Sequence, residues 1–148
     1  MKAQYANLDR DNKLIWNFRD IGHTMRRISE GKGSQKRILI ILLESGCMTQ
    51  KALTHRLGIQ PGSASEAIGK LENAGLIVRT PSADDHRTTD IALTPSGKAM
   101  AQSAYARRRE RHVQMFESLS EGEKDVLIQL LEKINVDWDQ KYRSQDGE

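Results

Sequence analysis

Apolar residues near the start of the chain recur at alternating steps of four and three positions. In order they are Leu14, Phe18, Ile21, Met25 and Ile28. On a helix this spacing forms one continuous apolar stripe, as in helices that pack lengthwise against other helices. We therefore predict a first helix with an apolar seam, and we expect Gly31 and Gly33 to end it.

The next segment is apolar on nearly every side of a helix. Ser34 can cap its amino end, the run ILIILLE covers residues 38–44, and Gly46 is placed to stop it. A helix that is apolar all round is buried in globular proteins. The pattern therefore predicts a central core helix.

Two short helical patterns follow, one on each side of Gly58. Thr49 can cap the first of them. Its inward positions are Ala52, Leu53 and Leu57. Gly58 can take the left-handed turn that follows, and Pro61 suits the first position of the second helix, where its missing N–H has no partner to lose. Two helices joined by a short turn with glycine form a helix-turn-helix.

The second helix of this pair has an apolar face and, opposite it, a face made largely of small side chains. We expect Gly75 to end this helix. The apolar positions are Ala64, Ala67, Ile68 and Leu71. Opposite them lie Gly62, Ser65, Glu66, Gly69 and Asn73. Glycines and small hydroxyl side chains let a helix approach base edges and phosphates closely. We therefore expect a docking face lined by hydroxyls rather than by salt bridges.

The segment after this helix predicts a β-hairpin. Residues 76–80 favour a strand, and residues 88–94 alternate with Ile91 and Leu93 on one face. Thr94 and Pro95 can then start a long helix that runs to about Ser118.

The last helix is marked by a capping box, Ser120 with Glu123. Its apolar positions step by four, three and four, like those of the first helix. They are Leu127, Leu131, Ile134 and Trp138. The two seams together carry more apolar surface than a monomer of 148 residues can cover, so we expect them to pack in a closed two-fold dimer.

These elements predict a mainly α fold with a small β-hairpin wing, that is, a winged helix-turn-helix flanked by N- and C-terminal dimerisation helices. We expect an N-terminal dimerisation helix in residues 1–32 and the winged helix-turn-helix in residues 33–96. Residues 97–144 should hold the long connecting helix and the C-terminal dimerisation helix, and residues 145–148 a disordered tail.

Composition narrows the classes of protein only slightly. The 23 Lys and Arg residues against 20 Asp and Glu residues give a net charge of +3, an excess too small to indicate nucleic-acid binding by itself. No apolar run approaches the roughly 18 residues that span a bilayer. The single cysteine, Cys47, excludes an internal disulfide. We expect a soluble cytoplasmic protein.

Neither a catalytic motif nor a metal-binding motif stands out. The sequence shows no Ser-His-Asp arrangement, phosphate-binding glycine loop or paired-carboxylate motif, which argues against an enzyme. The four histidines are scattered, so no metal or other cofactor is expected, although a zinc site assembled across a dimer is an alternative. Cys47 lies in the short link before the helix-turn-helix, where we expect it to be buried; redox sensing through it is the lesser alternative.

Two segments resemble the MarR family of bacterial and archaeal transcription regulators. They are TQKALTHRLGIQPGSASEAIGKLENAGLIVR (residues 49–79) and DHRTTDIALTPSGKAM (residues 85–100), and the likeness extends over nearly the whole chain. The second segment matches the family's Asp-x-Arg pattern, apolar strand and Leu-Thr-x-x-Gly. The resemblance implies a homodimer that binds a double-stranded, pseudo-palindromic DNA operator, most often as a repressor. It also implies control by a small phenolic or aromatic effector, a metal or an oxidant, and the sequence leaves its identity open.

The resemblance places a recognition helix at residues 61–74, in the DNA-binding domain of residues 33–96, and it places Arg87 at the wing tip that enters the minor groove. With the hydroxyl, glycine and basic positions around them, the candidate DNA-binding residues are Lys36, Arg37, Thr49, Gln50, Lys51, Gln60, Gly62, Ser63, Ser65, Glu66, Lys70, Arg79 and Arg87. The candidate dimer interface consists of Leu14, Phe18, Ile21, Met25, Leu127, Leu131, Ile134 and Trp138.

Two features leave alternatives open. Glu66 stands where family members often carry a basic residue, so its carboxylate either accepts a hydrogen bond from a cytosine amino group or turns away from DNA and leaves recognition to the serines. The wing carries Arg79 and Arg87 against three aspartates, which either leave it with only moderate non-specific affinity for DNA or hold Arg87 in place. The alternative function is therefore a winged-helix protein-interaction module with little DNA affinity.

Overall fold

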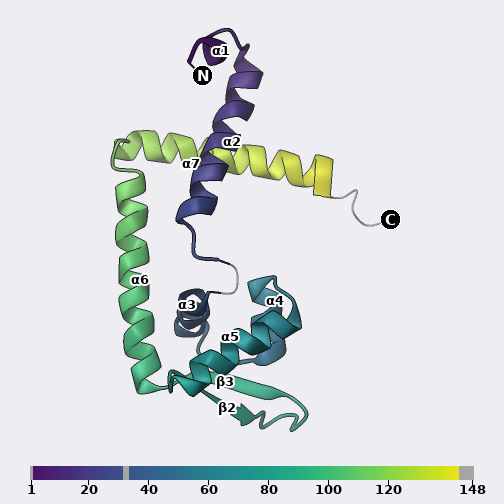
Figure 1. The fold of residues 1–148 in the computed structure, drawn as a ribbon. Coiled ribbons are helices and arrows are strands. Elements are labelled where there is room, and N and C mark those ends of the chain that lie inside the picture. Colours follow the sequence, from purple (N-terminus) through teal and green to yellow (C-terminus); the bar gives the residue numbers. More distant parts are fainter. Residues whose placement is uncertain (1, 32–33, 144–148) are drawn as a thin grey trace. The chain divides into compact units, whose positions relative to one another are not determined.

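The computed structural model describes residues 2–31 and 34–143 (Figure 1). Its elements are α1 (Lys2–Ala6), α2 (Arg10–Ile28), α3 (Gln35–Ser45), β1 (Met48–Thr49), α4 (Gln50–Leu57), α5 (Pro61–Asn73), β2 (Ile77–Pro81), β3 (Thr89–Leu93), α6 (Pro95–Met115), α7 (Glu121–Trp138) and a π-helical segment, η1 (Asp139–Arg143). The predicted fold class, mainly α with a winged helix-turn-helix, is confirmed.

The chain divides into two compact units, Met1–Gln102 and Ser103–Glu148. The first unit contains the helix-turn-helix, the strands and the start of α6; the second contains the rest of α6, together with α7 and η1. The finer division expected from the sequence, with boundaries at residues 32 and 96, stays a prediction, and the expected disordered tail of residues 145–148 lies outside the described residues.

The core of the first unit forms around α3, as the sequence predicts. Residues 38–42 of this helix are all buried. Leu53 and Leu57 of α4 and Ile68 and Leu71 of α5 are buried in the same cluster. Each fully buried side chain of this size contributes about 1.5–3 kcal/mol through removal of apolar surface from water. The apolar faces of α4 and α5 are therefore committed to α3, and their other faces are left for solvent or a partner.

The wing is a β-hairpin with one additional short strand. The strand order is β1–β3–β2, and all pairs are antiparallel. In the hairpin, Ile77 pairs with Leu93 and Pro81 with Thr89. The sequence did not predict β1, because its two residues are too few to show an alternating pattern and Thr49 also serves as a helix cap.

The predicted helix caps are confirmed at several helix ends. The hydroxyl oxygens of Ser34 and Thr49 accept hydrogen bonds from the N–H groups three residues on. Gly58 takes the left-handed conformation with φ of 63°. Ser120 and Glu123 form both bonds of the capping box. Side-chain caps satisfy N–H groups that no helical carbonyl reaches.

Four local expectations were wrong. The helix α2 ends at Ile28 with Ser29 as its cap, before Gly31 is reached, because the Ser29 N–H still donates to the Met25 carbonyl while its ψ is already extended. The helix α6 ends at Met115 rather than near Ser118. Ala52 is exposed, since only Leu53 and Leu57 of α4 point toward the core. Cys47 is exposed in the link between α3 and β1, where the pairing of Met48 with Ile91 leaves it outside the core.

Gly97 lies where the first turn of α6 passes directly over the backbone of Leu76. The Thr94 N–H donates to the Leu76 carbonyl at 3.1 Å, and the Thr94 hydroxyl donates to the Gly75 carbonyl at 2.7 Å. A Cβ atom on residue 97 would lie 1.8 Å from the Leu76 carbonyl oxygen, so only glycine fits. The Leu-Thr-x-x-Gly pattern therefore fixes the start of α6 against the start of the wing.

Among the described residues, no helix is both long enough and apolar enough to cross a membrane.

Candidate nucleic-acid interface

The helix α5 presents a slender face away from the core. Its buried residues Ala64, Ile68 and Leu71 define one side. Gly62, Glu66, Gly69 and Asn73 follow one another at steps of four, three and four, so they form a single row on the opposite side. Gly62, Glu66 and Asn73 are exposed, and Gly69 is half-buried.

Gly62 and Gly69 are not required by any contact within the chain. A Cβ atom built at either position would meet no other atom within 4 Å, and neither has a positive φ. Glycine inside a helix costs about 0.5–1 kcal/mol relative to alanine. The chain therefore carries a stability cost at these positions that its own fold does not explain. A face that must approach a partner closely would explain it.

Ser65 is held by the preceding helix. The side-chain amide of Gln50, the first residue of α4, donates to the Ser65 hydroxyl oxygen at 3.0 Å. A hydroxyl that accepts one bond in this way still has its own hydrogen to donate. The contact brings two predicted DNA-binding residues of α4 and α5 together, and Ser65 remains exposed.

Glu66 and Lys70 form an ion pair on the exposed surface of α5. The Lys70 ammonium nitrogen lies 2.7 Å from a Glu66 carboxylate oxygen, and both side chains are more than half exposed. The hydrogen bond from Lys70, aided by its charge, lowers the pKa of Glu66. The sequence led us to expect a face of α5 lined by hydroxyls rather than by salt bridges. That expectation was wrong, because this ion pair lies on the face. The i,i+4 geometry of a helix brings these two side chains together.

Arg79 is tied to the end of α5 rather than free. Its guanidinium makes two bonds of 2.9 Å to the Glu72 carboxylate. These bonds lower the pKa of Glu72 and raise the pKa of Arg79. A bidentate pair of this kind fixes orientation as well as distance. Arg79 therefore joins β2 to α5, so that wing and helix hold a common geometry.

The wing tip is organised by Asp85. Its carboxylate accepts a hydrogen bond of 3.0 Å from the Arg87 backbone N–H, and its carbonyl accepts from the Thr88 N–H at 2.9 Å. This is the local side-chain-to-backbone pattern of an Asx turn. The Arg87 side chain is exposed. Of the two open roles for the aspartates, Asp85 thus holds the backbone at Arg87 in place.

The other predicted DNA-binding residues differ in how free they are. Lys36, Lys51, Gln60 and Ser63 are exposed, and Gln60 precedes α5 without a side-chain bond to the helix. The Thr49 hydroxyl is used as the cap of α4. Arg37 is half-buried, and its guanidinium donates to the Leu57 carbonyl at 3.3 Å, at the end of α4.

The predicted dimer residues lie on helices that their own units leave uncovered. Neither α2 nor α7 has a buried residue. On α2, Leu14 is 54% exposed and Ile21 56% exposed. Leu127 and Trp138 of α7 are also exposed, and Phe18, Leu131 and Ile134 are half-buried. Met25 is exposed as well. Exposed apolar surface on this scale marks an interaction surface.

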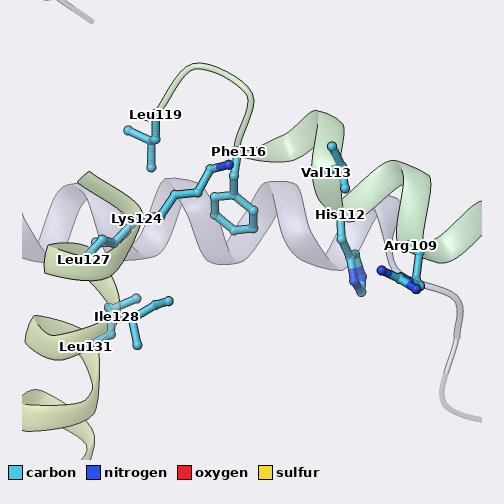
Figure 2. A pocket seen from close by; sticks show the side chains of 9 residues that line it. All are labelled: Arg109, His112, Val113, Phe116, Leu119, Lys124, Leu127, Ile128 and Leu131. Atoms are coloured by element: carbon cyan, nitrogen blue, oxygen red, sulfur yellow. The ribbon is translucent and has the colours of Figure 1, made fainter. Parts of the chain in front are cut away.

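A groove of about 370 Å³ opens in the second unit, between the end of α6 and the start of α7 (Figure 2). Its lining is mostly apolar, with Arg109 and His112 at one end and the Lys124 side chain reaching toward Phe116. The lining residues are Arg109, His112, Val113, Phe116, Leu119, Lys124, Leu127, Ile128 and Leu131. Two of the predicted dimer residues, Leu127 and Leu131, are among them, so the groove is continuous with the uncovered surface of α7.

Glu72 and Asp85 organise this interface, and both were missing from the candidates predicted from the sequence. The sequence could have indicated Asp85, because an Asp side chain in a turn can accept a hydrogen bond from the backbone N–H two residues on. For Glu72 there was no such signal, because seven positions and a helix-to-strand turn separate it from Arg79. Within residues 2–31 and 34–143, no group of three His, Cys, Asp or Glu residues could hold a metal ion.

Comparisons with known proteins agree with this geometry. The model of the MarR family matches residues 33–89. The uncharacterised HTH-type transcriptional regulator YwhA of Bacillus subtilis is 30% identical over 97 residues, which are 66% of this chain and 70% of YwhA. The multiple antibiotic resistance protein MarR of Salmonella typhimurium is 28% identical over 102 residues, 68% of this chain and 71% of MarR. These relatives are named as regulators and not as enzymes. They confirm the expectation from the sequence that the protein is not an enzyme.

Solved structures show the same fold. A probable transcriptional regulator from Pseudomonas aeruginosa superposes with a TM-score of 0.57 at 29% identity, over 68% of this chain and 75% of that one. A MarR variant from E. coli, solved in complex with operator DNA, gives a TM-score of 0.65 at 20% identity, over 86% of this chain and 99% of that one. The matched segments of the curated relatives span about two thirds of their lengths.

Proposed function

This chain belongs to the MarR family, and from that membership we propose that it is a ligand-responsive repressor that binds a pseudo-palindromic DNA operator as a homodimer. The relatives are transcriptional regulators, and the helix-turn-helix and wing on which such regulators depend are present here.

The observation that carries DNA binding is the open face of α5. The row from Gly62 to Asn73 has room for close approach, and the positions of its neighbours are fixed by the Gln50–Ser65 bond and the Arg79–Glu72 pair. A rigid helix with a slender polar face fits the major groove of B-DNA, which is about 12 Å wide. A minor-groove contact by Arg87 is supported by its exposure at the wing tip, since basic side chains favour that groove's negative potential.

The homodimer is supported by the uncovered apolar surfaces of α2 and α7. Exposed side chains such as Leu14, Ile21 and Val136 would be covered by a second copy, and so would the groove lined by Leu127 and Leu131. Two recognition helices related by a two-fold axis would then read half-sites about one helical turn, 34–36 Å, apart.

The same arrangement would allow regulation by an effector. A ligand that favours one separation of the two recognition helices shifts the population toward or away from the spacing that fits the operator. Consider an effector that binds only the state whose helix spacing does not fit the operator. At effector concentrations above the effector's Kd, it lowers operator affinity in proportion to its concentration. The family resemblance implies a phenolic or aromatic effector, a metal or an oxidant, and the first of these classes is the simplest to test.

The experiment that tests this function is selection of bound sequences from a random pool of double-stranded DNA at near-physiological salt, with the dimer checked by light scattering. We expect an inverted repeat from a dimeric protein. Enrichment of no sequence by a folded dimer would refute the proposal and favour the protein-interaction module. A panel of phenolic and aromatic acids added to the selected operator complex tests the effector, and release of the DNA is the expected result.

A further inference from the structure

The exposed row of α5 has one prominent side chain at its centre. Glu66 has Gly62 four positions before it and Gly69 three positions after it on the same face. Neither glycine has a neighbouring side chain that fills the space beside it. Whatever α5 docks against therefore meets the Glu66 carboxylate between two stretches of bare backbone.

A carboxylate in this position needs a donor on the partner. An exposed glutamate is ionised at neutral pH, and the hydrogen bond from Lys70 lowers the pKa of Glu66 further. An ionised carboxylate only accepts hydrogen bonds. Phosphate groups are themselves anionic acceptors and would repel it. In the major groove the available donors are the N4 amino group of cytosine and the N6 amino group of adenine.

The acceptors beside each donor decide between these two bases. A carboxylate at adenine N6 would lie between two acceptors, adenine N7 and thymine O4, which repel it. At cytosine N4 the one neighbouring acceptor is guanine O6, about one N–H···O bond of 2.9 Å away, and a lysine can donate to it. The Glu66 carboxylate and Lys70 ammonium are 2.7 Å apart, so together they present an acceptor and a donor at matching separation.

We propose that the Glu66–Lys70 pair reads a C·G base pair in each half-site, with Glu66 accepting from cytosine N4 and Lys70 donating to guanine O6 or N7. This inference rests on the proposed function and makes it more specific. The ammonium also offsets the negative charge that Glu66 brings close to the DNA backbone, so the pair remains compatible with a polyanion. Of the two roles left open by the sequence, this geometry assigns base contact to Glu66.

The test compares the sequences selected by the wild type and by Glu66→Gln. The amide is nearly isosteric with the carboxylate, and the side chain is exposed, so the fold should be unaffected; a thermal melt of the variant checks this. Glutamine pairs with adenine N6 and N7, so we expect the preference at one symmetric position to move from C toward A. The ratio of affinities for the C and A operators should change by at least about fivefold.

The matched control is Glu121→Gln. This change removes the same charge from another exposed glutamate that pairs with a lysine, Lys124 at 2.6 Å, at the start of α7 and not on the recognition helix. It should leave the selected motif unchanged. Lys70→Met should weaken the preference for guanine at the same base pair.

Each outcome has one meaning. A wild-type motif with a symmetric C·G pair that changes only with substitutions in the Glu66–Lys70 pair supports the inference. If Glu66→Gln selects the same motif as the wild type, the base-pair assignment is overturned, while operator binding itself still stands. Failure of the wild type to select any motif refutes the proposed function, and the base-pair assignment with it.

Discussion

The side-chain amide of Gln50 donates a 3.0 Å hydrogen bond to the hydroxyl oxygen of Ser65, and so joins the first residue of α4 to the exposed part of α5. Neither residue is required by the core, since Gln50 is only half-buried and Ser65 is exposed. The bond instead sets the direction in which the Ser65 hydroxyl can donate. It makes the start of α4 part of the recognition surface.

This bond predicts coupled effects on operator binding. Ser65→Ala and Gln50→Ala should each weaken binding, and the double variant should lose less than the sum of the two, because the second change removes a contact already broken. The expected coupling is about 0.5–1.5 kcal/mol. Anisotropy titrations with the selected operator measure all four proteins. Strictly additive losses would show that the two residues act independently.

Gly69→Ala should separate stability from binding. The added methyl group meets no other atom within 4 Å, and alanine favours the helix, so the free energy of unfolding should rise by about 0.5–1 kcal/mol. Operator affinity should nevertheless fall, because the methyl group keeps α5 further from the base edges. Denaturant unfolding and operator titration provide the two measurements.

Gly122→Ala in the first turn of α7 is the matched control for that change. A Cβ atom there also meets nothing within 4 Å, and residue 122 is off the predicted dimer stripe, so the variant should keep its operator affinity. If Gly69→Ala binds the operator as tightly as the wild type, close approach along this face is not needed.

Arg87→Ala should weaken binding most on operators whose flanks are rich in A·T. These flanks have a narrow minor groove with an enhanced negative potential, to which an exposed arginine at the wing tip is attracted. Titrations on operators with A·T-rich and G·C-rich flanks give the comparison. An equal loss on both would place Arg87 on phosphates, and the slope of affinity against salt would then fall by about one charge.

The Glu72–Arg79 pair predicts a pH-dependent contribution to stability. The pKa of Glu72 is lowered in the folded protein by the hydrogen bond from Arg79, so the pair stabilises the fold at pH values above the pKa of an unfolded glutamate, about 4.3. This contribution is lost as the pH falls through the lower, folded pKa. Glu72→Gln should therefore lower the Tm at neutral pH, and its difference from the wild type should vanish in acid.

Thermal melts of both proteins from neutral pH into the acid range check this result. A difference that persists unchanged in acid would mean that packing of the Glu72 side chain, and not its charge, stabilises the wing. Arg79→Gln should behave like Glu72→Gln, because each variant removes the same pair of hydrogen bonds.

Gly97→Ala should destabilise the winged helix-turn-helix. The new Cβ atom would lie 1.8 Å from the Leu76 carbonyl oxygen, which is backbone and cannot rotate away. Relief requires a shift of the start of α6, at a cost of about 1–3 kcal/mol or more. Gly122→Ala is the control, since a Cβ atom at residue 122 meets nothing within 4 Å. Equal melting temperatures for the two variants would contradict the close approach of α6 to Leu76.

The sequence by itself determined the order of the longer helices and of the hairpin, and several of the helix ends, but not α1, β1 or η1. Helix-end motifs act over only three or four residues, so they can be recognised in the sequence. Here they are the caps Ser34 and Thr49, the left-handed Gly58 and the capping box at Ser120. The all-apolar run of α3 likewise identified the core helix, because burial on every side leaves no polar position. The candidate DNA-binding residues followed from the position of α5 in that order.

Only the tertiary structure decided what those candidate residues touch. The Gln50–Ser65 bond, the Glu72–Arg79 pair and the contact of Gly97 with Leu76 each join residues on different elements. Their partners depend on how α4, α5, the wing and α6 pack around α3, and no sequence spacing specifies that packing. The exposure of Cys47 was decided in the same way, because a two-residue strand too short to predict places it outside the core. Local hydrogen bonding and hydrophobic periodicity can be predicted from neighbouring residues in the sequence. The geometry of the recognition surface depends on contacts between segments that are distant in the sequence.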